Sequence, residues 1–209
     1  MKLLYIMDPL CGWCYGNSAN MIRLEKEFDW KLEIEVLPWG MWVGERARYQ
    51  SPELAGYIRP ADARLRAITW VEMSEAYDRL LDDTSIFLDS EPGSRAINTV
   101  KKMNPSLTLT FASILARSRY VDGLDNTILP TFLSVAKTLN IDTKVFQEMH
   151  ESELLKKYTI ETFIRAGEYA HSYPSIFLER GDSMVVPIAL SNYHYESIRN
   201  EIAENIFDK

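Results

Sequence analysis

The two cysteines of the chain, Cys11 and Cys14, lie three positions apart near the N-terminus, between an apolar run and a helical pattern. The apolar run at residues 2–6 has the length of a buried strand, and apolar residues recur at helical spacing after the cysteines. A Cys-x-x-Cys pair at such a junction is typical of a dithiol redox site. Because the first turn of a helix directs unpaired N–H groups and its dipole at a thiolate, we predict Cys11 as the nucleophile and Cys14 as the resolving thiol.

Two structural uses of the cysteine pair are less well supported. A disulfide that closes so small a loop removes little entropy from the unfolded chain and therefore adds little stability. A structural zinc site needs two further ligands. The chain has no other cysteine, and His150, His171 and His194 are too far apart in the sequence for the usual paired spacing. We therefore predict no metal site.

Composition narrows the classes of function. The chain has 209 residues, of which 46% are hydrophobic and 25% charged, as in an ordinary globular protein. Its net charge of −7 argues against binding of nucleic acid, which requires basic surface. The apolar run before Asp8 is too short for a signal peptide, and no stretch is long enough to span a membrane, so we expect a cytoplasmic protein without membrane association. In a reducing compartment a close cysteine pair is more often catalytic than structural.

Hydrophobic periodicity predicts the fold. Residues 31–37 alternate charged and apolar side chains up to Pro38, so the chain begins as strand, helix, strand with a parallel pair. Residues 44–170 have helical spacing, with helix starts indicated by Pro52, Pro92 and Pro105 and by a capping Asp142.

The C-terminal part returns to strands. Residues 175–179 and 183–188 read as a β-hairpin around the turn 180–182, with Pro187 on an edge strand, and residues 193–207 read as an amphipathic helix. We therefore predict an α/β protein with a thioredoxin fold (βαβ…ββα). Residues 1–43 and 171–209 form its thioredoxin-like domain, and residues 44–170 form a large all-helical insertion whose last helix packs on the sheet.

Three segments carry a resemblance to a known family: residues 8–16 (DPLCGWCYG), 90–96 (SEPGSRA) and 173–178 (YPSIFL). Together they resemble the signal-less members of the DsbA thioredoxin family, which are described as protein-disulfide isomerases. The resemblance implies a thioredoxin fold, a dithiol catalyst and a cis-proline facing it. On this analogy Pro174 is the cis-proline, and the backbone of Tyr173 before it pairs with an extended substrate.

The residues around the cysteines are expected to tune the redox couple. Many DsbA-type oxidants have a histidine between the two cysteines, whereas this chain has the uncharged Gly12 and Trp13. An ionised Asp8 close to Cys11 would disfavour the thiolate. We therefore expect a less oxidising site than that of the periplasmic oxidants.

A substrate groove is predicted after the second strand. Trp39, Met41 and Trp42 follow that strand, and methionine and aromatic side chains suit the recognition of varied apolar segments. The alternative is that these residues pack the insertion against the sheet, and the sequence leaves both interpretations open.

The predicted function is exchange or isomerisation of disulfides through a mixed disulfide. The site needs no cofactor beyond the Cys11–Cys14 dithiol, and glutathione is a candidate reductant. Expected partners are proteins that contain thiols or disulfides, or small thiols, and exposed apolar surface in the insertion is a candidate homodimer face.

Two alternative functions remain open. One is a glutathione-dependent enzyme similar to kappa-class glutathione transferases and hydroxychromene-carboxylate isomerases, which typically have a serine at the position of Cys11. The other is a non-catalytic chaperone or redox-sensing module, whose activity would not depend on Cys11.

Overall fold

A mixed four-stranded sheet forms the centre of the protein. The computed structural model describes residues 1–29, 31–180, 184–190 and 193–207. The strands lie in the order β2-β1-β5-β6, with bounds β1 Lys2–Met7, β2 Glu33–Pro38, β5 Ser175–Glu179 and β6 Val185–Ile188. Strand β1 is parallel to β2 and antiparallel to β5, and β5 is antiparallel to β6. This topology confirms the predicted thioredoxin fold.

Strand β1 is apolar without interruption because both of its faces are covered. Successive side chains of a strand point to opposite faces. Accordingly, Leu3 and Tyr5 belong to one hydrophobic core and Leu4 and Ile6 to another, and all four are buried.

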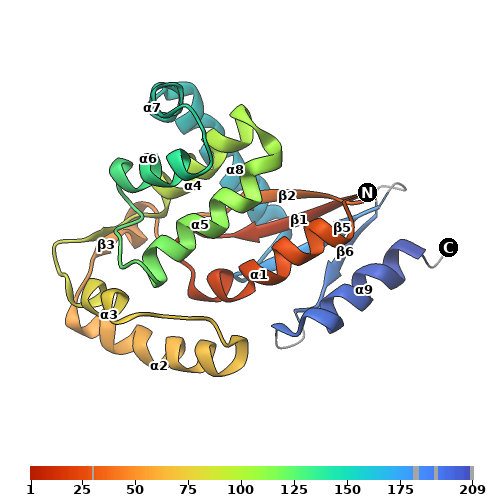
Figure 1. The fold of residues 1–209 in the computed structure, drawn as a ribbon, viewed down its shortest axis with the longest axis horizontal. Coiled ribbons are helices and arrows are strands. Elements are labelled where there is room, and N and C mark those ends of the chain that lie inside the picture. Colours follow the sequence, from red (N-terminus) through yellow and green to blue (C-terminus); the bar gives the residue numbers. More distant parts are fainter. Residues whose placement is uncertain (30, 181–183, 191–192, 208–209) are drawn as a thin grey trace.

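Helices from distant parts of the chain cover the two faces of the sheet (Figure 1). Helices α1, Gly12–Glu27, and α9, Tyr195–Phe207, share the core of the first face, which includes Leu24 of α1 and Ile202 of α9. Helix α8, Glu153–Tyr169, covers the second face, where Ala166 packs with the side chains of β1. The small alanine lets this helix approach the strands closely.

The insertion is helical apart from one short ladder. Its helices before α8 are α2 Pro52–Thr69, α3 Glu75–Asp82, α4 Ser90–Met103, α5 Thr108–Tyr120, α6 Leu129–Thr138 and α7 Thr143–His150, with 3-10 turns at Gly44–Arg46 and Pro105–Leu107. Strands β3, Arg48–Tyr49, and β4, Phe87–Leu88, pair with each other over two residues. Runs this short leave no period in the sequence, so the pattern did not predict the ladder.

Capping residues start the helices where the sequence indicates. The Ser51 side chain accepts a hydrogen bond from the Leu54 N–H at the start of α2, and the Asp142 side chain accepts from Lys144 and Val145 at the start of α7. Each side chain supplies a partner that the first turn of a helix lacks.

Three elements have bounds that differ from the prediction. Strand β2 starts at Glu33 and includes Pro38, which pairs with Met7, while β6 starts at Val185 and α9 at Tyr195. Apolar spacing alone does not define where backbone pairing begins. Pro187 lies on β6 at the edge of the sheet, as predicted, whereas most of the predicted 180–182 turn lies outside the described residues.

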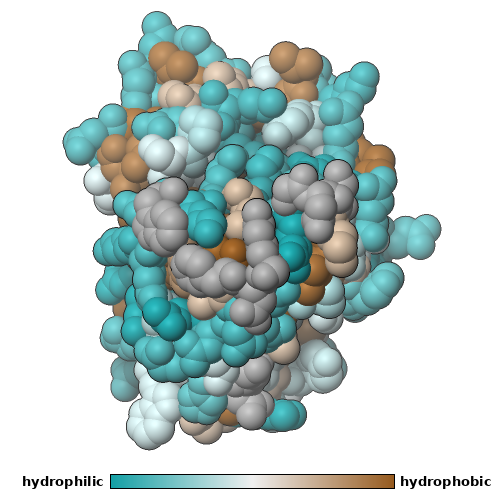
Figure 2. All heavy atoms as spheres, turned by 90° about the vertical axis from the view of Figure 1, so that its right-hand side faces the viewer, coloured by the Kyte–Doolittle hydropathy of each residue, from teal (hydrophilic) through white to brown (hydrophobic). Residues whose placement is uncertain are grey.

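The surface at the end of the sheet near the chain termini is mostly hydrophilic, with apolar side chains in separate small areas (Figure 2). This end is opposite to the junction of β1 and α1 (Figure 1). Within the part of the chain that the structure describes, no helix combines the length and apolarity needed to cross a membrane.

Candidate active site

The two cysteines lie where β1 passes into α1. Cys11 is the N-cap of α1, and its Sγ accepts a hydrogen bond from the Cys14 N–H at 3.2 Å. The sulfur thus takes the place of the capping oxygen that many helices have. Both cysteines are free thiols, and Cys11 is 5% and Cys14 2% exposed. Cys11 therefore occupies the position at the helix terminus that a nucleophilic thiolate requires.

The environment of Cys14 favours its protonated form. Burial raises the pKa of the Cys14 thiol well above its ordinary value, and the hydrogen bond to Cys11 and the charges of Cys11 and Asp8 raise it further. Cys14 is thus held as a thiol one turn into the helix, which suits a second, resolving attack.

Asp8 is a buried carboxyl group that joins two loops of the site. Its Oδ1 accepts a hydrogen bond from the Leu10 N–H at 2.8 Å, and its Oδ2 accepts one from the Met41 N–H at 2.7 Å. Burial raises the pKa of Asp8 to about 6 although these bonds lower it. Asp8 therefore fixes the loop after β2 against the loop before Cys11, and its charge acts on Cys14.

The peptide bond between Tyr173 and Pro174 is cis, as the resemblance implied. The Tyr173 ring packs on Trp39 with ring centroids 4.6 Å apart. The pKa of Tyr173 is raised, mainly by burial. The negative charge of Asp8 and the charges of the two cysteines raise it further. Tyr173 is therefore close enough to the dithiol for these charges to act on it. A substrate-binding role for Tyr173 and Pro174 stays a prediction.

A cavity of about 230 Å³ opens beside Cys11. It lies between the loop of the dithiol and helices of the insertion, and its lining includes Cys11, Met41, Trp42, Asp62, Arg119 and Tyr120. Trp39 is not among the described residues that line it, because its ring packs on Tyr173 and approaches Gly167 of α8. The three residues of the predicted groove thus divide between the cavity and the packing of the insertion.

Sequence reasoning missed two charged residues in this cavity. Asp62 of α2 is 8% exposed and Arg119 of α5 is 3% exposed. Each interrupts an apolar stripe at helical spacing: Asp62 lies three positions before Leu65, and Arg119 lies four after Leu115. A charge within a buried stripe is unusual, and this signal could have identified both residues.

Gly12 and Trp13 have different surroundings. A Cβ atom on Gly12 would lie 3.2 Å from Asp62 Oδ1 and 3.3 Å from a methyl group of Leu65, so glycine leaves room for α2 to lie against the dithiol. The Trp13 ring stacks on Tyr193 with centroids 5.2 Å apart. Gly12 therefore faces the insertion, and Trp13 faces the segment before α9.

The insertion also holds the loop before Cys11 in place. The Tyr120 hydroxyl donates to the Leu10 carbonyl at 2.9 Å, and the Asn126 side-chain amide donates to the Pro9 carbonyl at 2.8 Å. These bonds connect residues more than 100 positions apart. No group of three or more His, Cys, Asp or Glu side chains among the described residues could hold a metal ion.

Solved structures with the same architecture are known. A protein proposed to be a disulfide isomerase from Nitrosomonas europaea superposes with a TM-score of 0.88 at 22% identity, covering 99% of this chain and 98% of that one. The cytosolic disulfide reductase DsbM of Pseudomonas aeruginosa has a TM-score of 0.86 at 24% identity over 100% of both chains, and its structure with GSH has 0.83 at 23% over 99% of both.

A 2-hydroxychromene-2-carboxylate isomerase is less similar, with a TM-score of 0.65 at 13% identity over 100% of this chain and 98% of that one. The fold is that of the DsbA-like proteins. No protein-family model matches the chain, and no curated protein matches it with significant similarity. Identities below 25% establish the fold, and the chemistry has to be argued from the site.

Proposed function

We propose that this protein is a thiol–disulfide oxidoreductase whose nucleophile is Cys11. The observation that carries the proposal is the position of the Cys11 sulfur at the N-cap of α1, 3.2 Å from the Cys14 N–H, with the free Cys14 thiol in the first turn. A thiolate at a helix N-terminus with a second thiol within one turn is the arrangement that dithiol exchange needs.

The exchange proceeds in two balanced steps. The Cys11 thiolate attacks one sulfur of a substrate disulfide, a mixed disulfide forms, and the other half of the substrate leaves as a thiolate. Cys14 then loses its proton and attacks the Cys11 sulfur, which releases the second half as a thiolate and leaves a Cys11–Cys14 disulfide. Two electrons have passed from the dithiol to the substrate.

The direction we propose is reduction of substrate disulfides in the cytoplasm. The similar Pseudomonas protein is named a cytosolic disulfide reductase and has been observed with GSH, which supports a small thiol as the reductant that recycles the dithiol. Gly12 and Trp13, the residues between the cysteines, are both uncharged and add no cation that would stabilise the thiolate strongly. A function like that of the hydroxychromene-carboxylate isomerases is less well supported. The solved structure of such an isomerase is less similar to this protein, and this chain has cysteines at both positions of the motif, whereas those enzymes typically have a serine at the position of Cys11.

Substrate would lie between the dithiol and the cis peptide bond. In the proposed complex the Tyr173 backbone pairs with an extended segment next to the attacked disulfide. Pro174 has no N–H to compete for that backbone.

The test is trapping of the mixed disulfide. We expect Cys14→Ser to accumulate a covalent adduct with a small disulfide, detected by mass spectrometry, because the resolving thiol is missing. Cys11→Ser should form no such adduct and should have no exchange activity. The wild-type protein should cycle between dithiol and disulfide in glutathione buffers, followed by Trp13 fluorescence, with a midpoint nearer about −270 mV than about −120 mV.

Two results would overturn the proposal. One is an adduct that forms in Cys11→Ser as fast as in Cys14→Ser, which would mean that the nucleophile is another group. The other is a wild-type protein that forms no internal disulfide at any buffer potential.

A further inference from the structure

Arg119 is a buried cation that has no ion pair in the described part of the chain. It is 3% exposed, yet the only hydrogen bond from its side chain to a described residue is a long one, 3.5 Å to Asn126 Oδ1. Its guanidinium lies 5.8 Å from the centre of the Tyr77 ring, and no carboxylate of the described residues is within ion-pair distance of it. A guanidinium has five N–H donors, and a buried charge is costly unless it is paired. The group is therefore suited to receive an anion from outside the chain.

Asp62 provides the opposite charge at the same cavity. Its Oδ2 accepts a hydrogen bond from the Tyr77 hydroxyl at 2.8 Å, while its Oδ1 has no donor among the described residues. That free oxygen faces the dithiol, since a Cβ atom on Gly12 would lie only 3.2 Å from it. One oxygen is held by the protein and the other remains available to a cation.

The two charges are close without neutralising each other directly. The charge of Arg119 lowers the pKa of Asp62, against a larger rise caused by burial, so each group is within the field of the other. They do not approach to ion-pair distance, and both line the cavity that contains Cys11. A ligand that carries an ammonium and a carboxylate on the same carbon atom would satisfy both groups.

The size of the cavity limits that ligand. Its volume of about 230 Å³ is below the range of about 300–1,000 Å³ that is usual for pockets that take drug-sized molecules. The cavity therefore suits one small group next to the attacked disulfide.

We propose that this cavity binds the α-amino-acid group of a small disulfide, with Arg119 taking its carboxylate and Asp62 its ammonium. The inference rests on the proposed function and names its substrate class. Cys11 attacks the sulfur nearest to the bound group, a mixed disulfide forms with that half, and the other half leaves as a thiolate. The chain itself supplies the electrons, as in the exchange described above.

Four small disulfides separate the two charges. Cystine carries both groups, 3,3′-dithiodipropionate only carboxylates, cystamine only ammonium groups, and 2-hydroxyethyl disulfide neither. The measured quantity is the rate of adduct formation at Cys11 in the Cys14→Ser protein, by mass spectrometry. Each rate is divided by the rate of the same disulfide with a small free thiol, which removes differences in intrinsic reactivity.

We expect the corrected rate for cystine to exceed that for 2-hydroxyethyl disulfide by about tenfold or more, the value of one charge-assisted hydrogen bond. Arg119→Gln should reduce by about tenfold the advantage of the disulfides with carboxylates over the neutral one. Asp62→Asn should reduce by about tenfold the advantage of the disulfides with ammonium groups over the neutral one. Because each effect is a ratio within one protein, a partly unfolded variant does not imitate it.

Matched control variants lie on the same elements or next to them. Arg117 is on α5, is exposed and pairs with Asp122 at 3.1 Å, and Asp82 at the end of α3 is exposed and pairs with Arg59 at 2.7 Å. Arg117→Gln and Asp82→Asn, each added to Cys14→Ser, should leave the four corrected rates at the values of the Cys14→Ser protein, since neither residue lines the cavity.

The outcomes separate this inference from the proposed function. If Cys11 reacts with all four disulfides without preference in the otherwise unsubstituted protein, the amino-acid site is wrong and the oxidoreductase proposal stands. The same holds if a preference exists but survives both cavity substitutions. If none of the four disulfides reacts with Cys11, the oxidoreductase proposal fails and this inference fails with it.

Discussion

Two arginines of the insertion, Arg95 on α4 and Arg119 on α5, are both largely removed from solvent, but their surroundings differ. The Arg95 side chain is 11% exposed and forms an ion pair with Glu91 at 2.9 Å. It also donates to Glu91 Oε2 at 3.1 Å and to the His150 carbonyl at 3.0 Å. Arg119 has one hydrogen bond, of 3.5 Å, among the described residues. The chain thus pairs the charge of the first arginine itself, whereas the described residues leave the second without an ion pair at a cavity.

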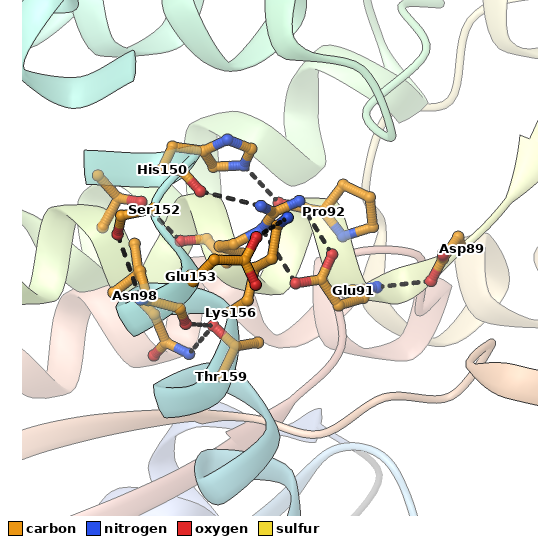
Figure 3. Close-up of polar contacts among 12 residues, drawn as sticks. Asp89, Glu91, Pro92, Asn98, His150, Ser152, Glu153, Lys156 and Thr159 are labelled. Carbon is orange, nitrogen blue, oxygen red and sulfur yellow. Dashed lines mark hydrogen bonds and ion pairs between the residues drawn. The ribbon is translucent and has the colours of Figure 1, made fainter. Parts of the chain in front are cut away.

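The surroundings of Arg95 form a network that joins three helices. Figure 3 shows residues of α4, α7 and α8 meeting there. The His150 ring lies 3.1 Å from the Pro92 carbonyl through Nε2, and the Asn98 amide donates to Thr159 of α8 at 3.2 Å. Such a network fixes the helices relative to one another. A buried charge that the chain pairs indicates structure, whereas one left unpaired beside a nucleophile indicates binding.

The largest expected effect on stability comes from substitution of Arg95, the arginine that has an ion pair. Arg95→Met should lower the free energy of unfolding by about 2–3 kcal/mol, because it leaves the half-buried Glu91 carboxylate, 25% exposed, without its cation and removes the bond to the His150 carbonyl. Urea unfolding monitored by circular dichroism measures it. The control is Arg79→Met on α3, whose exposed side chain lies 4.0 Å from Glu75 and should cost less than about 1 kcal/mol. A loss below about 1 kcal/mol in Arg95→Met would show that the network contributes little.

The sequence predicts local features of the site and not this contrast between the arginines. The cysteines at the β1–α1 junction follow from a short segment whose residue types carry the signal, whereas the cis bond before β5 follows only from the family resemblance that residues 173–178 support. The partners of Arg95 and the environment of Arg119 depend on how helices pack. The His150 carbonyl is 55 positions from Arg95, and Asn126 reaches Pro9 across 117 positions. A single sequence contains no direct record of such contacts, so both arginines look alike in it.

A second, smaller effect is the pH dependence of stability, which tests the part of His150 in the network. Burial, together with the charge of Arg95, lowers the pKa of His150 to about 4 from its ordinary value of 6.5. Between these values the unfolded chain binds more protons than the folded one. The stability that the neutral ring contributes is therefore complete above pH 6.5 and is lost as the pH falls towards 4. The loss is at most about 3 kcal/mol, and about 2 kcal/mol once solvent screening is included.

His150→Gln isolates this contribution, since it removes the titrating ring while keeping an amide that can donate. We expect the variant to lose about 2 kcal/mol less than the wild type between pH 7 and pH 4, measured by urea unfolding at each pH. Asp8, with its pKa raised to about 6, changes stability in the opposite direction over part of this range, but it is present in both proteins and cancels. Parallel pH profiles would mean that His150 is accessible to protons in the folded state.

The smallest expected effect, on Arg119, is the one that decides the comparison. Arg119→Met should change the free energy of unfolding by less than about 1 kcal/mol in either direction, because the substitution removes a buried charge that has no ion pair in the described chain and keeps most of the apolar side chain. Unfolding in urea under the conditions used for Arg95→Met gives a direct contrast between the same substitution at two sites. A loss of about 3 kcal/mol or more would show that the protein itself completes Arg119. A stable variant would instead show that the fold tolerates an unpaired cation it does not need, as expected where function determines the residue.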